Sequence, residues 1–160
     1  MGEPQVKRQS HIWIMFAALV AGLGFSAPAS ATTNPTQTHI DSVLANYPGG
    51  IQTGWNEVSW DDGDVVLTVA LGDVHARAAV GTCANGKHCV YSSPGLLGSK
   101  LTFSTCSNQS VSALGGPVKS VANARSSGTV TAKNGSTPVL SIAPGAYKNT
   151  SATVTQVSCT

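Results

Sequence analysis

Residues 88–106, HCVYSSPGLLGSKLTFSTC, hold the pattern that decides the fold. Two short runs in it, His88–Ser92 and Lys100–Cys106, are typical of strands because β-branched and aromatic residues recur in them. Four further strand-like runs follow toward the C-terminus: Val118–Ala124, Thr129–Lys133, Pro138–Ala143 and Ala152–Val157. Turn signals at Asn134-Gly135 and Pro144-Gly145 separate some of them, and no helical period of any length appears after residue 50. The sequence therefore predicts an all-β sandwich.

A short helix and a β-hairpin are predicted ahead of these strands. Apolar residues recur at helical spacing over His39–Tyr47, and Pro48-Gly49-Gly50 ends the run. Asn56–Trp60 and Asp64–Ala70 are strand-like, and Asp61-Asp62-Gly63 joins them as a hairpin turn would. The acidic residues of this turn are interpreted as a polar hairpin tip, because no spaced set of calcium ligands follows them.

The N-terminus has the three-part pattern of a secretory signal. Met1–Trp13 contains Lys7, Arg8 and His11 and forms a short basic region, Ile12–Phe25 is uncharged and mostly apolar, and Ala29-Ser30-Ala31 supplies small residues for cleavage. The apolar run is shorter than the roughly 20 residues that a membrane span needs. We therefore expect cleavage after Ala31 and a secreted, extracellular protein with no membrane contact once the signal is removed.

These features divide the chain into three predicted segments. They are a signal peptide at 1–31, an N-terminal extension with the helix and hairpin at 32–82, and an all-β domain at 83–160. Within the extension, Thr32–Thr38 is expected to be a polar, poorly ordered leader. Leu71–Thr82 is expected to be a linker.

Charge is scarce and segregated. Charged residues make up 10% of the chain, which with plentiful β-branched residues suits a small, secreted, β-rich protein. After the predicted signal, all acidic residues precede Val74 and all basic residues follow His75. One interpretation is a positive face for an acidic partner, and the favoured one is that the two segments pack together and neutralise. The basic part has no dense run, so we expect no nucleic-acid partner.

Four cysteines follow the predicted signal: Cys83, Cys89, Cys106 and Cys159. An even number fits disulfides in an exported protein, and arithmetic alone does not choose among the possible pairings. Asn85-Gly86 is a tight-turn dipeptide that can bring the sulfurs of Cys83 and Cys89 together. A zinc site that joins these thiols to His75 or His88 is the less favoured alternative, because the spacing of the first two cysteines exceeds that of structural zinc.

Catalytic motifs are missing from the sequence. It contains no G-x-S-x-G elbow, H-E-x-x-H helix, phosphate loop or dinucleotide fingerprint. Only His39, His75 and His88 follow the predicted signal, and the basic part has no carboxylate. Acid–base and nucleophilic catalysis need titratable groups that converge. We therefore expect a protein that is not an enzyme and that uses no metal or cofactor.

The region from Cys83 to Cys159 carries the motifs of a known family. They are Cys83-x5-Cys89-Val90-Tyr91-Ser92, Gly95-Leu96-Leu97-Gly98, Val118–Ser127, Ile142–Ala146 and Ala152–Thr155. On these residues the sequence resembles the small secreted actinobacterial peptidase inhibitors with a βγ-crystallin-like fold, typified by the Streptomyces metalloproteinase inhibitor. The resemblance implies a Greek-key sandwich at 83–160. Together with the turn, it also favours the pairs Cys83–Cys89 and Cys106–Cys159.

Tyr91, Leu96 and Gly98 match the Greek-key motif of this resemblance, in which Leu96 replaces an aromatic residue. The family implies that Tyr91 caps a folded hairpin and that Gly98 adopts a backbone conformation that side chains resist. In Ala122–Ser127, alanine stands where the crystallin calcium motif has a ligand, so no tight calcium site is expected. The family's disulfide-framed reactive loop is absent from Val130–Ser141, which contains no cysteine.

Together these features predict a monomeric, secreted inhibitor that blocks an extracellular peptidase stoichiometrically through an exposed loop. The favoured contact is Ser107–Pro117, the longest polar connection, and Ser93–Ser99 is the second candidate. The residues singled out in the favoured loop are Ser107, Val111, Leu114, Gly115 and Pro117. Leu114 is expected to fill a pocket of the peptidase, so that Leu114→Ala would weaken inhibition.

The alternative is a binding or killer-toxin-like module that acts on other cells or on cell-wall polymers. Surface aromatics would favour glycan binding. After Cys83 the chain keeps only Tyr91, Phe103 and Tyr147. In the extension, Trp55 and Trp60 could form a binding platform, although burial is the commoner arrangement for hairpin aromatics.

Overall fold

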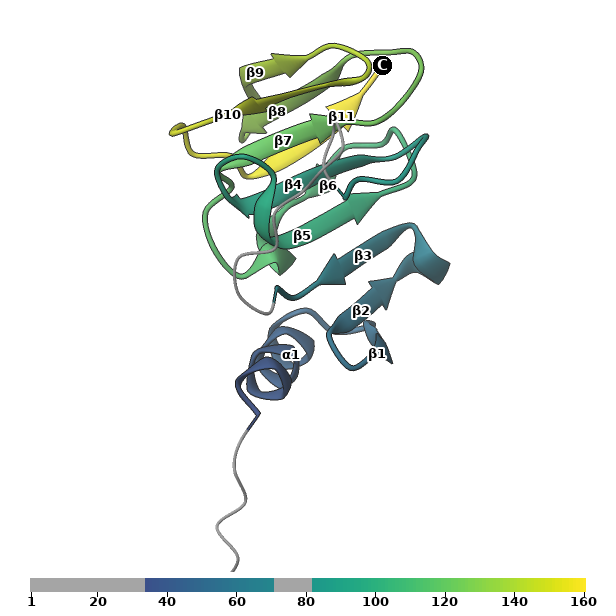
Figure 1. Cartoon of the computed structure of the whole chain (residues 1–160), viewed down its shortest axis with the longest axis vertical. Helices are drawn as coiled ribbons and strands as arrows, with labels where there is room; N and C mark the ends of the chain where they lie inside the picture. Colours follow the sequence, from purple (N-terminus) through teal and green to yellow (C-terminus); the bar gives the residue numbers. More distant parts are fainter. Residues whose placement is uncertain (1–33, 71–81) are drawn as a thin grey trace, which may run out of the picture. The chain divides into compact units, whose positions relative to one another are not determined.

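Figure 1 presents a computed structural model of the protein, which describes residues 34–70 and 82–160. The predicted signal peptide at 1–31, and nearly all of the predicted linker Leu71–Thr82, lie outside the described residues. The described residues all belong to one compact unit. Within them, no helix is long and apolar enough to cross a membrane.

The described residues form one α-helix, eleven strands and two short 3₁₀ helices. In chain order they are α1 (Pro35–Asn46), β1 (Ile51–Gly54), β2 (Glu57–Trp60), η1 (Asp61–Gly63), β3 (Val65–Thr68), β4 (His88–Ser93), β5 (Leu97–Phe103), β6 (Gln109–Ser110), η2 (Ser112–Leu114), β7 (Ser120–Asn123), β8 (Val130–Asn134), β9 (Thr137–Ile142), β10 (Ala146–Asn149) and β11 (Gln156–Cys159). The predicted all-β class is confirmed, because strands dominate and the single helix is short.

The helix begins earlier than the sequence predicts. Asn34 caps its N-terminus by accepting a hydrogen bond from the Thr36 backbone N–H at 3.0 Å, and Pro35 occupies the first turn. The expectation of a poorly ordered leader is therefore wrong for Pro35–Thr38, which form the first helical turn. The helix buries Ile40 and Val43, which lie on one face at the spacing of a helix.

The strands form two antiparallel sheets. The seven-stranded sheet has the order β1-β2-β3-β5-β4-β7-β10, and the four-stranded sheet has the order β6-β11-β8-β9. The predicted hairpin is confirmed as β2–β3, with η1 as its turn. β3 then pairs with β5, with Leu67 opposite Leu101. Strands from the predicted extension and from the predicted 83–160 domain therefore lie in one sheet (Figure 1).

Some strands differ from those predicted. The predicted strand Ala152–Val157 is wrong over most of its length, because β11 starts at Gln156 and continues to Cys159. Strands β1, β6 and β10 were not predicted. All three lie at sheet edges, and they are short and largely exposed, so no apolar alternation marks them in the sequence.

One core joins the helix to both sheets. Its fully buried members include Ile40 of α1, Phe103 of β5 and Val157 of β11. A second, smaller cluster contains the disulfide Cys83–Cys89. It lies on the face of β4 opposite to the face from which Val90 enters the main core. Its members are Cys83, Cys89, Tyr91, Leu96 and Ala122.

Both predicted disulfides are present. Cys83 is bonded to Cys89 with a Cα–Cα distance of 5.8 Å, and Cys106 is bonded to Cys159 with a Cα–Cα distance of 4.7 Å. The alternative of a zinc–thiolate site is therefore wrong, since all four sulfurs are in disulfides.

The residues of the predicted Greek-key motif lie together at the turn between β4 and β5. Gly98 has a φ of +77°, so the prediction that it adopts a conformation unfavourable to side chains is confirmed. Leu96 also has a positive φ, +65°, and its side chain is buried beside Tyr91 in the smaller cluster. Tyr91 is 1% exposed, so its ring serves as packing beneath this turn.

Candidate functional site

The predicted inhibitory loop Ser107–Pro117 is only partly exposed. Val111 and Leu114 are 4% and 2% exposed and belong to the main core. Leu114 is therefore not available to fill a pocket of a peptidase, and its expected role as the anchor is corrected. The loop also contains regular structure, because β6 pairs with β11 and η2 brings Leu114 into the core.

Helix α1 covers the second half of this loop. A Cβ placed on Gly115 would lie 3.1 Å from the His39 ring, so η2 and α1 are in close contact there. Ser112, Gly115 and Gly116 line a cavity together with His39 and other residues of α1. Gly115 and Pro117 are exposed, yet they lie beside the helix rather than on a free loop.

The first part of the loop keeps a free surface. Cys106, Ser107 and Asn108 are consecutive exposed residues. The disulfide to Cys159 fixes this segment to the end of β11. Cys106–Asn108 is thus the exposed segment at the start of the predicted contact, ahead of the part that lies beside α1.

Side chains of the four-stranded sheet form hydrogen bonds with this segment. The Asn108 amide donates a hydrogen bond to the side chain of Gln156 in β11 and accepts one from Lys133 Nζ of β8 at 3.3 Å. Gln109 Nε2 donates to Thr105 Oγ1 at 3.0 Å and to Ser107 Oγ at 2.7 Å. The segment is therefore tied to its surroundings on both sides of Ser107.

The second predicted loop, Ser93–Ser99, is a tight turn with an exposed tip at Pro94 and Gly95. The Gly95 N–H donates to Asn149 Oδ1 at 2.8 Å. The Leu96 N–H donates to Ser120 Oγ at 3.1 Å. With Leu96 buried, only two residues of this turn project outward.

Asn123, which falls in the crystallin-like calcium motif, acts as a structural residue. It is fully buried, and its Nδ2 donates to the carbonyl oxygens of Gly128 at 2.9 Å and Ile142 at 3.2 Å. Its Oδ1 accepts a hydrogen bond from the Arg125 N–H at 3.2 Å. Its side chain is thus committed to the loop that follows β7. In the part of the chain that the structure describes, no group of three His, Cys, Asp or Glu side chains could hold a metal.

The acidic and basic parts of the chain meet at Lys100. This β5 lysine is partly buried, and its Nζ donates to the Thr82 carbonyl at 3.0 Å. Burial lowers the pKa of Lys100, and the negative charge of Glu57 in the extension opposes that shift. The pairing of β3 with β5, which places Thr68 opposite Lys100, agrees with the favoured interpretation that the two segments pack on each other.

His88 is a core residue. Its ring is fully buried and stacks on Phe103, with the ring centroids 5.2 Å apart, and Nδ1 lies 3.8 Å from Cys159 Sγ. Burial, and secondarily the positive charge of Arg125, lower the pKa of His88 from 6.5 to about 4. The imidazole is therefore neutral in the folded protein at pH 7.

Acid is expected to destabilise the protein through His88. Between pH 6.5 and about pH 4 the unfolded chain binds this proton and the folded chain does not, so stability falls as the pH falls through that range. The loss approaches about 3 kcal/mol below pH 4, and stability is insensitive to this group above pH 6.5. When the free energy of unfolding in urea is measured at a series of pH values, it should change less with pH for His88→Leu than for the wild type. An equal dependence on pH in the two proteins would contradict the lowered pKa assigned to His88.

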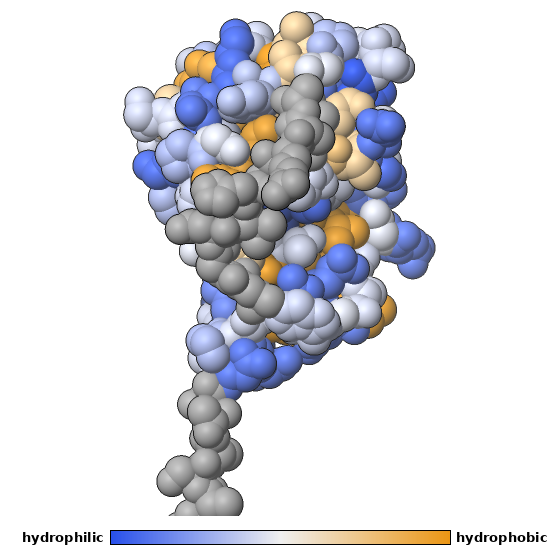
Figure 2. Space-filling view, viewed as in Figure 1, coloured by the Kyte–Doolittle hydropathy of each residue, from blue (hydrophilic) through white to orange (hydrophobic). Residues whose placement is uncertain are grey.

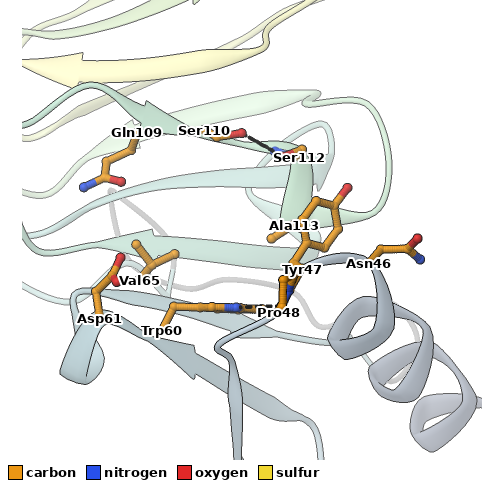
Figure 3. A pocket seen from close by; sticks show the side chains of 10 residues that line it. All are labelled: Asn46, Tyr47, Pro48, Trp60, Asp61, Val65, Gln109, Ser110, Ser112 and Ala113. Atoms are coloured by element: carbon orange, nitrogen blue, oxygen red, sulfur yellow. Dashed lines mark hydrogen bonds between the residues drawn. The ribbon is translucent and has the colours of Figure 1, made fainter.

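A groove that the sequence analysis missed lies between α1, the β2–η1 corner and the β6–η2 segment (Figure 3). Its volume is about 370 Å³, and Tyr47, Trp60 and Gln109 are among its lining residues. Trp60 is half-buried and Trp55 is 60% exposed on the β1–β2 turn, so the two tryptophans do not form one platform. The groove escaped prediction because its walls come from three distant parts of the chain.

The fold and the two disulfides define a small all-β protein of a kind that fits the extracellular environment. Comparisons with models of protein families, with characterised proteins and with solved structures give no match.

Proposed function

We propose that the protein is a secreted peptidase inhibitor and that Cys106–Asn108 is its contact with the enzyme. The observation that carries the proposal is an exposed segment fixed by a disulfide and by hydrogen bonds on both sides. A segment held in one conformation loses little conformational entropy on binding, and so keeps more of its contact energy as affinity. The motifs between Cys83 and Cys159 support the same assignment.

The surface is consistent with a contact made by a loop. On the face drawn in Figure 2, outside the grey atoms, hydrophobic residues form separate patches among hydrophilic ones. A rigid polar segment suits the active-site cleft of a peptidase, in which the inhibitor's main chain can occupy the place of a substrate. In this proposal the protein acts as a monomer, stoichiometrically, and without a cofactor or turnover of its own.

The test is titration of secreted serine peptidases and metallopeptidases with the purified protein. A responsive enzyme should lose its activity linearly, with an end point at one inhibitor per enzyme. Asn108→Ala removes the side-chain bonds to Gln156 and Lys133, and should weaken inhibition roughly tenfold, or about 1–2 kcal/mol. Asn134→Ala is the matched control, because this exposed asparagine at the end of β8 forms no side-chain hydrogen bond with the segment.

The outcomes separate the function from the contact. If no enzyme of either class is inhibited, the proposed function is wrong. If the wild type inhibits and Asn108→Ala inhibits equally well, the function stands and the contact lies elsewhere, with the Pro94-Gly95 turn as the next segment to change.

A further inference from the structure

The groove of Figure 3 contains an aromatic surface that is fixed in place before any ligand arrives. The indole N–H of Trp60 donates to the Tyr47 carbonyl at 3.1 Å. A Cβ on Gly50 would lie 2.6 Å from Trp60 Cε2 and Nε1, so the indole rests directly against the Gly50 backbone and only glycine leaves room for it. Trp60 is thus held by a hydrogen bond and by close packing, and it still lines the open groove.

The polar groups around this indole offer oxygen acceptors. Asn46 uses its Nδ2 to donate to the Ser42 carbonyl at 2.7 Å, and the Gln109 Nε2 is occupied by Thr105 and Ser107. Their side-chain oxygens and the Asp61 carboxylate accept no hydrogen bond from any described residue. Figure 3 places Asp61 and Gln109 toward one end of the indole, whereas the Asn46 side chain lies beyond Tyr47 and points away from the indole.

The charge of the groove limits the ligand further. None of the residues that line it is a lysine, arginine or histidine, and Asp61 supplies a negative charge. An anionic ligand would meet that carboxylate without a compensating cation. The groove therefore suits a neutral or cationic molecule that is rich in hydrogen-bond donors and apolar on one face. Its volume of about 370 Å³ lies within the range of small-molecule sites.

We propose that this groove binds the pyranose ring of a neutral or amino sugar. The apolar C–H face of the ring would stack on the Trp60 indole, and its hydroxyl or ammonium donors would reach Asp61 and Gln109. An apolar peptide side chain could cover the indole but would form no hydrogen bonds with these acceptors. The groove adjoins the proposed inhibitory segment through Gln109, which contacts Ser107, but the proposed sugar binding does not depend on peptidase inhibition.

Trp60 itself can report binding. The full chain contains three tryptophans, so a variant with Trp13→Phe and Trp55→Phe keeps Trp60 as its only one. We expect saturable changes in its fluorescence with chitotetraose, which is neutral, and with its deacetylated form, which is cationic. The cationic form should bind about threefold more tightly because of Asp61. Polygalacturonate, which is anionic, should give no saturable change.

Two variants test the individual contacts by calorimetry. Asp61→Asn keeps a residue that tolerates the positive φ of this position, and should remove the preference for the cationic form. Trp60→Phe should weaken binding of both oligosaccharides about tenfold. Trp55→Phe is the matched control and should bind as the wild type does, because Trp55 does not line the groove.

The proposal is overturned if neither oligosaccharide changes the Trp60 fluorescence in a saturable manner. It is also overturned if polygalacturonate binds as well as the neutral form, or if Asp61→Asn and Trp60→Phe both bind as the wild type does. If circular dichroism shows that Trp60→Phe does not fold, the Asp61→Asn variant and the fluorescence titration still test the proposed sugar binding. Peptidase inhibition by the same variants is measured separately, so failure of one proposal is distinguishable from failure of the other.

Discussion

Replacing Leu114 by alanine is expected to lower the free energy of unfolding by about 2–5 kcal/mol. The side chain is 2% exposed and lies in the core cluster that also contains Ile40 and Val43 of α1. Truncation removes apolar contacts and leaves a cavity that the surrounding strands fill only in part. Urea unfolding followed by circular dichroism measures the loss. Any weakening of peptidase inhibition should then follow from unfolding rather than from a lost contact.

Leu140→Ala is the matched control for this experiment. Leu140 of β9 is half-buried at the edge of the same core, so the identical truncation should cost only about 1 kcal/mol. A cost for Leu114→Ala no larger than that of the control would mean that Leu114 is accessible. It would restore Leu114 as the candidate anchor of an exposed loop.

The hairpin from Glu57 to Thr68 shows what the sequence could predict. In β3, buried residues alternate with partly buried ones, and the turn joins β2 and β3 through residues adjacent in the chain, so local patterns determine the pairing. The Cys83–Cys89 disulfide was predictable for the same reason, because a tight turn separates the two residues. The positive φ of Gly98 followed from a motif in which the glycine is required.

The burial of Leu114 shows what the sequence could not predict. A polar stretch with one leucine and two glycines is typical of an exposed loop when only its own residues are considered. Its apolar side chains are buried because the extension supplies α1 as a cover, and that contact spans about 70 residues of chain. The groove has the same origin, since Tyr47, Trp60 and Gln109 belong to three segments that only the folded chain brings together.

Removing the Cys106–Cys159 disulfide is expected to lower the free energy of unfolding by about 4 kcal/mol. The bonded residues are 53 apart in the chain, and in the chain-entropy model the stabilisation grows with the logarithm of that separation. The residues of Cys83–Cys89 are 6 apart, which predicts about 2 kcal/mol for that bond. The variants Cys106→Ala with Cys159→Ala, and Cys83→Ala with Cys89→Ala, remove the same atoms and so form a matched pair for urea unfolding.

The position of Cys159 gives this disulfide a second effect. Cys159 ends β11, which lies between β6 and β8 in the four-stranded sheet, and the proposed inhibitory segment starts at its partner Cys106. Breaking the bond should therefore loosen that segment even in protein that remains folded, and so weaken inhibition of a responsive peptidase. The Cys83–Cys89 variant, measured where both proteins are folded, should inhibit as the wild type does. Equal losses of stability in the two variants would contradict the argument from loop length. Equal inhibition by the two variants would show that the Cys106–Cys159 disulfide is not needed for the contact with the peptidase.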